Sequence, residues 1–236
     1  MHPQYAIRTT LRTDAMRSPV AVNSVPLSGV AGDREPLAQS MQLMGAAMSY
    51  PRNTEIFGEN ELADYVYKVV SGSVRTYKIL SDGRRQIGGF YLPGDIFGMQ
   101  LADEHAFSAE AITDTKVLVV KRSALTALAG RDAAVGRELF NLTSRELRRM
   151  QDRILLLIKS AQERVASFLL EMAERACAGN TVELPMSRQD IADYLGLTIE
   201  TVSRTLTGLE GTAAIEVLTS RRIALRNRAA LSRLNS

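Results

Sequence analysis

Cysteine and histidine are scarce in this sequence of 236 residues, which contains one cysteine, Cys177, and two histidines, His2 and His105. A single cysteine excludes an internal disulfide framework and fits the reducing cytoplasm, where we expect the protein to reside. One thiol and two scattered imidazoles are too few for a structural zinc site, so we predict no metal. No nucleophile–base pair and no glycine-rich phosphate loop is evident, and the sequence therefore does not indicate an enzyme.

Long hydrophobic runs are also missing. No apolar stretch approaches the roughly 18–20 residues that span a bilayer. The arginines near the N-terminus are not followed by the apolar segment of a secretory signal. Hydrophobic residues make up 45% of the chain and charged residues 23%, which is ordinary for a soluble globular protein. We therefore expect no membrane partner.

The composition and the hydrophobic pattern of the first half of the chain divide it into two parts, 1–35 and 36–130. Residues 1–35 mix Pro, Ser, Gly, Val and Arg without a period, which predicts a flexible N-terminal extension. Within 36–130, four short runs are separated by turn signals such as Asp82-Gly83: "YVYKVV", "VRTYKIL", "QIGGFYL" and "KVLVVK". Short strands at this spacing, with an Asp-Gly hairpin turn, predict an antiparallel β-roll or sandwich.

Glycine and proline then vanish between residues 137 and 178. Apolar residues recur there in steps of three and four, which is the seam of a long helix that packs against another helix. We predict a dimerisation helix over 131–160, with a helix that packs on its own β domain as the alternative. The predicted interface residues are Leu147, Met150, Ile154, Leu157 and Ala161.

Two short helices joined by a glycine turn are predicted next, within a domain over 161–236. Ser187 can cap the first helix, Gly196 breaks it, and Thr198 can cap the second helix. The stretch "AAIEVLTSRRIALR" then reads as strand, turn and strand. This order is typical of a winged helix-turn-helix.

The second helix presents Glu200, Ser203 and Arg204 side by side, because residues three and four apart are neighbours on one helix face. Arg204 can bond guanine O6 and N7, Glu200 can accept from the cytosine amine, and Ser203 can bond a base or phosphate. The alternative is an ordinary amphipathic hairpin with solvent-facing polar groups. Arginines of the C-terminal stretch are either phosphate contacts or a solvated basic tail. We predict double-stranded DNA contacts from Glu200, Ser203, Arg204, Thr201, Thr198, Ser187, Arg188, Thr205, Arg221 and Arg222.

The segment "SRQDIADYLGLTIETVSRTLTGLE" resembles the helix-turn-helix of the cyclic-AMP receptor protein/fumarate-nitrate regulator superfamily, and "ETVSR" resembles the Glu-x-x-Ser-Arg signature of its fumarate-nitrate branch. The similarity extends over about 50–225 and looks closest to the FixK-type regulators of nitrogen fixation and microaerobic respiration. It implies an α+β fold: an N-terminal cyclic-nucleotide-binding-like β-roll, a long dimerisation helix and a C-terminal winged helix-turn-helix. It also implies a homodimer that binds a TTGAT…ATCAA-like palindrome and contacts RNA polymerase, mainly as an activator. The segment "GLEGTAAIEV" departs from the pattern, since it lacks the basic residue and glycine usual after the recognition helix.

The usual effectors of that superfamily do not suit this sequence, and we predict no cofactor. Nucleotide binders resemble one another in a Glu for the ribose and an Arg for the phosphate, and Met99 and Phe107 fall at those positions. Burying a cyclic phosphate without a countercharge is costly. An iron–sulfur cluster requires four thiolates, and the chain has one. The alternative is an unidentified small ligand in the β-roll.

Cys177 has two interpretations: an inert, buried small hydrophobe, or a redox switch. Oxidation near DNA phosphates would add negative charge and weaken binding. A third class of protein, a β-roll module whose C-terminal helices bind other proteins, also stays open.

Overall fold

The computed structural model describes residues 36–100, 102–156, 158–176 and 179–234. The predicted extension 1–35, Leu157 and Cys177 lie outside these ranges. Among the described residues, no helix has the length and apolar character that crossing a membrane requires.

The N-terminal half folds into two four-stranded antiparallel sheets, in the orders β1-β8-β3-β6 and β2-β7-β4-β5. The four predicted runs are β3, β4, β5 and β8, and the Asp82-Gly83 turn joins β4 to β5 as predicted. Buried and less buried positions alternate at the start of β4 and of β8, as expected for strands with one buried face, whereas β3 and β5 depart from strict alternation. The strand bounds are β1 Ala46–Tyr50, β2 Glu55–Phe57, β3 Tyr65–Ser71, β4 Val74–Ile79, β5 Arg85–Tyr91, β6 Ile96–Phe97, β7 Ser108–Ala111 and β8 Thr115–Lys121.

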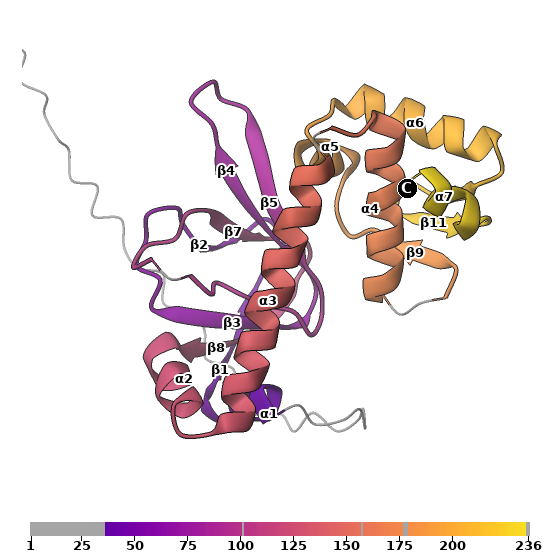
Figure 1. Cartoon of the computed structure of the whole chain (residues 1–236). Helices are drawn as coiled ribbons and strands as arrows, with labels where there is room; N and C mark the ends of the chain where they lie inside the picture. Colours follow the sequence, from indigo (N-terminus) through magenta and orange to yellow (C-terminus); the bar gives the residue numbers. More distant parts are fainter. Residues whose placement is uncertain (1–35, 101, 157, 177–178, 235–236) are drawn as a thin grey trace, which may run out of the picture.

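Helices α1 (Pro36–Met44) and α2 (Arg122–Ala129) lie at the lower end of the β-roll, beside the start of α3 (Figure 1). Proline at the first position of α1 is favourable because its missing N–H would have no partner there. The long helix α3 (Ala133–Leu156) then runs from this end of the β-roll toward the C-terminal domain (Figure 1).

The predicted long seam is wrong at its end, because Ala161 does not belong to α3. That helix ends at Leu156, and Ala161 is instead the first residue of a second helix, α4 (Ala161–Ala176). The break arises at Ser160, whose hydroxyl accepts from the Glu163 backbone N–H at 3.3 Å, while the Glu163 carboxylate accepts from the Ser160 N–H at 2.6 Å. This capping box starts a new helix where apolar spacing alone suggested continuation.

The C-terminal domain packs three more helices and a small sheet on α4. The bounds are β9 Thr181–Glu183, α5 Arg188–Leu195, α6 Ile199–Gly211, β10 Ile215–Thr219, β11 Arg222–Leu225 and α7 Arg228–Leu234. The strands form one antiparallel sheet in the order β10-β11-β9. The predicted α+β class, with β-roll, long helix and winged helix-turn-helix, is confirmed.

One hydrophobic cluster joins the two halves of the molecule. Ile87, Phe90 and Ile112 of the β-roll are buried in the same cluster as Phe168 of α4 and Ile191 of α5. The boundaries 130/131 and 160/161 remain our proposal for the domain division, but the β-roll and the C-terminal domain share one hydrophobic cluster.

Candidate nucleic-acid interface

The first helix of the helix-turn-helix, α5, begins at a capping box. The Ser187 hydroxyl accepts from the Asp190 backbone N–H at 3.0 Å, and the Asp190 carboxylate accepts from the Ser187 N–H at 2.9 Å. Ile191 and Leu195 face the core. The sequence prediction of Ser187 as the cap is therefore confirmed, and the Ser187 hydroxyl is committed to Asp190.

The turn between the helices depends on Gly196, which has φ +66° and ψ +40°. Residues that carry a side chain rarely adopt this left-handed backbone conformation, whereas glycine adopts it readily. Thr198 then caps α6, since its hydroxyl accepts from the Thr201 backbone N–H at 3.2 Å. Val202, Leu206 and Leu209 are buried, so the opposite face of α6 is exposed to solvent.

Glu200, Ser203 and Arg204 are exposed on that outward face. The pKa of Glu200 is lowered by its own backbone N–H, by the Thr198 hydroxyl and by the positive charge of Arg204. Glu200 is therefore a charged acceptor near neutral pH. The structure brings together, at the start of one exposed helix, the acid, hydroxyl and guanidinium that the sequence predicted as base readers.

The other residues predicted to contact DNA from these two helices are partly buried or already hydrogen-bonded. The Thr201 hydroxyl lies 3.1 Å from that of Thr198, and the Thr205 side chain is half-buried. Arg188 is half-buried, and burial lowers the pKa of its guanidinium. Its Nη1 atom is buried and makes no hydrogen bond within the described part of the chain.

Two predicted wing arginines have different surroundings. Arg221 donates from Nη1 to the Pro185 carbonyl at 3.0 Å, so it ties the wing to the segment before α5. Arg222 is exposed at the start of β11. Arg226, which follows the wing, is paired with Glu216. Among these three, Arg222 presents the most accessible charge to a phosphate.

Sequence reasoning missed Ile199, the first residue of α6. Its side chain is 36% exposed beside Glu200, although an isoleucine is usually buried. No signal in the sequence indicated this exposure, because Ile199 lies three residues before Val202 and its spacing places it beside the buried face of α6.

The β-roll positions that would hold a cyclic nucleotide are used for packing. Met99 packs against the cluster around Val66 and Leu125. The ring of Phe107 lies so close to Gly88 that a Cβ added there would be 3.0 Å away. These contacts support the sequence inference that Met99 and Phe107 replace the polar groups of a nucleotide site.

His105, predicted as a loop residue, lies outside helices and strands but is buried, at 1% exposure. Its ring stacks on Phe57 with centroids 3.6 Å apart, and burial lowers its pKa. No group of three or more possible metal ligands occurs within the described ranges.

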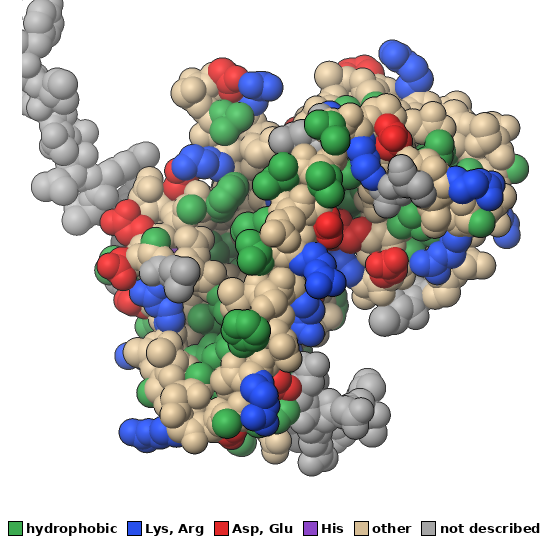
Figure 2. All heavy atoms as spheres, in the orientation of Figure 1, with side chains coloured by type: hydrophobic (Ala, Val, Ile, Leu, Met, Phe, Trp, Pro, Cys, Tyr) green, Lys and Arg blue, Asp and Glu red, His purple; other side chains and the backbone are tan. Residues whose placement is uncertain are grey.

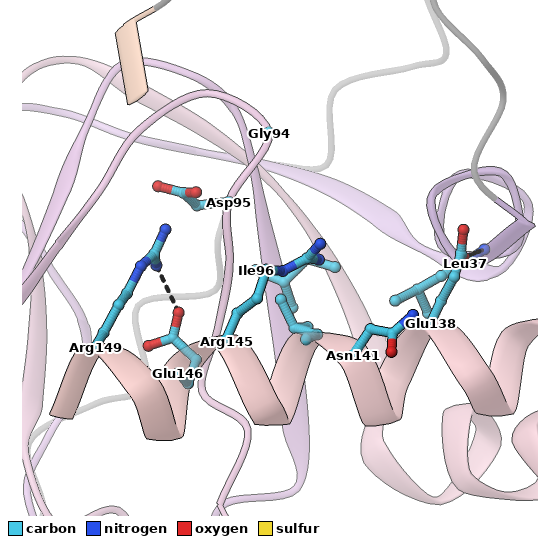
Figure 3. Close-up of a pocket in the computed structure, with 10 residues that line it drawn as sticks. Leu37, Gly94, Asp95, Ile96, Glu138, Asn141, Arg145, Glu146 and Arg149 are labelled. Atoms are coloured by element: carbon cyan, nitrogen blue, oxygen red, sulfur yellow. Dashed lines mark hydrogen bonds and ion pairs between the residues drawn. The ribbon is translucent and has the colours of Figure 1, made fainter. Parts of the chain in front are cut away.

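A cavity of about 370 Å³ lies between α3 and the turn that follows β5. Figure 3 shows Arg145, Arg149 and Glu146 extending from α3 toward this space, with Asp95 opposite. Four of its charged groups are already partnered: Glu138 accepts from the Leu37 N–H, Arg149 donates to Glu146 at 2.6 Å, and Asp95 accepts from Arg175 at 2.6 Å. The lining thus mixes both signs of charge and leaves no cluster of one sign for a ligand phosphate.

The capped helices, the exposed α6 and the wing define a winged helix-turn-helix regulator that binds DNA, joined to a β-roll of the cyclic-nucleotide-binding type. Two family models match the chain, the Crp-like helix-turn-helix domain over residues 163–234 and the cyclic nucleotide-binding domain over residues 47–132. With them, the relatives below show that the chain belongs to the Crp/Fnr family of transcription regulators, in its FixK-type branch. Members of this family are regulators and not enzymes.

The chain is 51% identical over 215 residues to the nitrogen fixation regulation protein FixK of Azorhizobium caulinodans, covering 88% of this chain and 87% of the relative. It is 40% identical over 195 residues to the transcriptional activatory protein AadR of Rhodopseudomonas palustris, covering 80% and 81%. Among solved structures, FixK2 from Bradyrhizobium japonicum superposes with a TM-score of 0.78 at 52% identity, over 82% of this chain and 98% of that one.

Proposed function

We propose that the protein is a homodimeric transcription activator of the FixK type that reads a TTGAT…ATCAA-like palindrome without a cyclic-nucleotide or iron–sulfur effector. The observation that carries this proposal is the exposed Glu200–Ser203–Arg204 face at the start of α6. The N-terminal residues of a recognition helix are the ones that meet base edges in the major groove.

Each residue of that face has a role. Arg204 donates two hydrogen bonds to a guanine, and the ionised Glu200 accepts from the amine of a cytosine. An acid would repel phosphates, so Glu200 favours base reading over simple electrostatic adhesion. Ser203 bonds a neighbouring base or phosphate. Ile199 adds apolar contact with a thymine methyl, which suits an A·T-rich half-site.

Phosphate contacts come from the arginines around the helix-turn-helix, with Arg222 the most accessible. Arg188 at the start of α5 is half-buried and its Nη1 atom is buried, so a phosphate contact from Arg188 requires its side chain to turn outward. Thr198, Thr201 and Ser187 first serve as caps or cap partners, and their DNA contacts are secondary.

The dimer rests on a row of exposed apolar side chains along α3. Leu147, Met150 and Ile154 are 57%, 62% and 64% exposed, and Phe140, one heptad before Leu147, is 72% exposed. Figure 2 shows several green patches of hydrophobic side chains on the face of the molecule that carries α3. A row of this kind marks a protein interface, and its heptad spacing suits the same helix of a second copy.

Independence from a ligand is supported by Met99 and Phe107, which occupy the nucleotide positions with apolar packing. The alternative, a small ligand in the β-roll region, has the mixed-charge cavity of Figure 3 as its candidate place. A thermal shift on adding a metabolite would favour that alternative.

The names of the relatives extend the proposal to nitrogen fixation and microaerobic metabolism, in the cytoplasm and through contact with RNA polymerase. Oxidation of Cys177 is the proposed means of switching the protein off. Peroxide should weaken DNA binding by the wild type but not by Cys177→Ser, and equal sensitivity of the two would rule out the switch.

The test of the main proposal is fluorescence anisotropy of a labelled palindromic duplex titrated with protein, with no ligand and again with cyclic AMP. We expect binding at the same affinity in both titrations, and none to a duplex with both half-sites scrambled. Binding that requires cyclic AMP would contradict effector independence, and equal binding to both duplexes would contradict base reading.

A further inference from the structure

Asp190 connects the helix-turn-helix to the β4–β5 hairpin. Its Oδ2 atom accepts from the Ser187 N–H and so completes the capping box of α5, as described above. Its other oxygen, Oδ1, accepts from Arg85 Nη2 at 2.7 Å and from Arg75 Nη1 at 3.0 Å. Both arginines belong to the β-roll, so one carboxylate serves the helix cap and an interdomain contact at once.

The two arginines are held on their other sides as well. Arg85 donates from Nε to Asp193 Oδ2 at 2.8 Å, and Arg75 donates to Glu110 Oε1 at 2.8 Å. The next residue of the hairpin, Gln86, donates to the Asp193 backbone carbonyl at 2.8 Å. We call the two arginines and three carboxylates the interdomain cluster: Arg75, Arg85, Glu110, Asp190 and Asp193.

The cluster is largely shielded from water. The side chain of Asp190 is 4% exposed, those of Arg75 and Asp193 are 12% and 13% exposed, and that of Arg85 is 25% exposed. Removing one partner of a buried ion pair is costly because a charge stays buried without compensation. Loss of Arg85 would leave the shielded Asp193 without its cation and Asp190 with Arg75 alone, which favours movement of α5 away from the hairpin toward water.

Apolar contacts beside the cluster hold the same two elements together. Phe90 of β5 packs on Tyr194 of α5 with ring centroids 5.1 Å apart. The guanidinium of Arg153, from α3, lies 4.6 Å from the Tyr194 ring centre and donates to the Ile87 carbonyl at 3.0 Å. With α5 fixed on its β-roll side, the outward face of α6 remains exposed.

We propose that Arg75 and Arg85 are positioning residues for DNA binding: they fix α5, and through it the recognition helix α6, in the orientation that reads DNA. This inference rests on the proposed function, because it explains how that orientation is kept without an effector. Neither arginine touches DNA in this account. They act by raising the fraction of molecules whose recognition helix is correctly placed, and apparent affinity falls in proportion to that fraction.

The hairpin offers a matched control in Arg84. Its guanidinium pairs with Asp82 of the same hairpin at 2.7 Å and is 78% exposed. Arg84→Gln removes the same charge, one residue away, without touching the cluster. The test compares Arg85→Gln, Arg85→Lys and Arg84→Gln in full-length dimeric protein, using palindromic duplex DNA without ligand.

We expect Arg85→Gln to weaken binding about 5- to 20-fold, a range typical of coupling between sites. Arg85→Lys, which keeps one charged contact, should fall between it and the wild type, and Arg84→Gln should stay within about twofold of the wild type. Hydrogen exchange, which needs no DNA, should show faster exchange in α5 and β5 for Arg85→Gln alone. Asp193→Asn should weaken binding in the wild type and have less effect in Arg85→Gln, because the two residues share one interaction.

The results separate the two proposals. If the wild type fails to bind the palindrome, the proposed function is wrong, and the exchange data still decide whether Arg85 holds α5. If the wild type binds and Arg85→Gln matches Arg84→Gln in both affinity and exchange, the positioning role is wrong. If Arg85→Gln does not fold, Arg85→Lys and Asp193→Asn carry the same comparison, and wild-type behaviour of both would overturn the inference.

Discussion

Arg85 of the β4–β5 hairpin donates to Asp190 at 2.7 Å, and Asp190 is also the residue that completes the capping box of Ser187 at the start of the DNA-binding motif. A residue of the sensor-like domain thus bonds to the side chain on which the start of α5 depends. In this protein, the β4–β5 hairpin of the β-roll therefore contacts the first helix of the DNA-binding motif directly.

Arg204→Ala should abolish the preference for the palindrome. A bidentate arginine–guanine pair contributes about 1–3 kcal/mol of discrimination, so specific affinity should fall by roughly 5- to 150-fold for each of the two half-sites. Fluorescence anisotropy with palindromic and scrambled duplexes measures the specific and the non-specific affinity. Arg222→Ala is the control, since losing a phosphate contact should weaken both duplexes alike and reduce the salt slope by about one. Similar behaviour of the two variants would contradict base reading by Arg204.

Met150→Glu should convert the dimer into a monomer. Met150 is 62% exposed in the single chain, and burying such a side chain against a partner contributes about 1.5–3 kcal/mol per copy. Sedimentation velocity at micromolar concentration reads the change directly. Gln151→Glu adds the same charge at the next exposed position, off the seam, and should leave the dimer intact. A dimeric Met150→Glu protein would place the interface elsewhere.

Two glycine substitutions in the helix-turn-helix should have opposite effects on stability. Gly196→Ala forces a side chain into the left-handed region at φ +66° and should lower the free energy of unfolding by about 1 kcal/mol. Gly208 lies within α6 with no atom near an added Cβ, and Gly208→Ala should raise that free energy by about 0.5–1 kcal/mol. Urea unfolding of the two variants checks this. Destabilisation of both by the same amount would mean that the left-handed turn is not the cause.

His105 should make stability depend on pH. Burial lowers its pKa in the folded protein below the ordinary value of 6.5, so the unfolded chain takes up the proton first as the pH falls. Stability should therefore be lost as pH falls through the unfolded value, by up to about 1.4 kcal/mol per pH unit. His105→Phe keeps the ring that stacks on Phe57 and should flatten the melting temperature between pH 7.5 and 5.5. Parallel curves for the two proteins would rule His105 out.

Local signals explain why the DNA-binding motif was predictable. Ser187, Gly196 and Thr198 each act through hydrogen bonds or backbone angles within a few residues, so their roles can be read from the chain alone. The hairpin turn at Asp82-Gly83 is local in the same sense. The break between α3 and α4 was also encoded locally, in Ser160 and Glu163, but the apolar spacing across it suggested one seam.

Long-range contacts explain what could not be predicted. Arg75 and Arg85 look like ordinary strand residues, and their partners Asp190 and Asp193 come more than 100 residues later. Nothing in the spacing shows that the hairpin will meet α5. The burial of His105 beneath Phe57 and the exposure of Phe140 likewise depend on how elements pack, which the pattern of one segment does not record.

Selection of bound sites from random duplex DNA by the purified protein, with no ligand added, tests the central claim most directly. We predict enrichment of a two-fold palindrome with TTGAT-like half-sites, whose centres lie about one helical turn or a multiple of it apart. No enrichment without an added metabolite, or enrichment of single, unpaired sites, would contradict it.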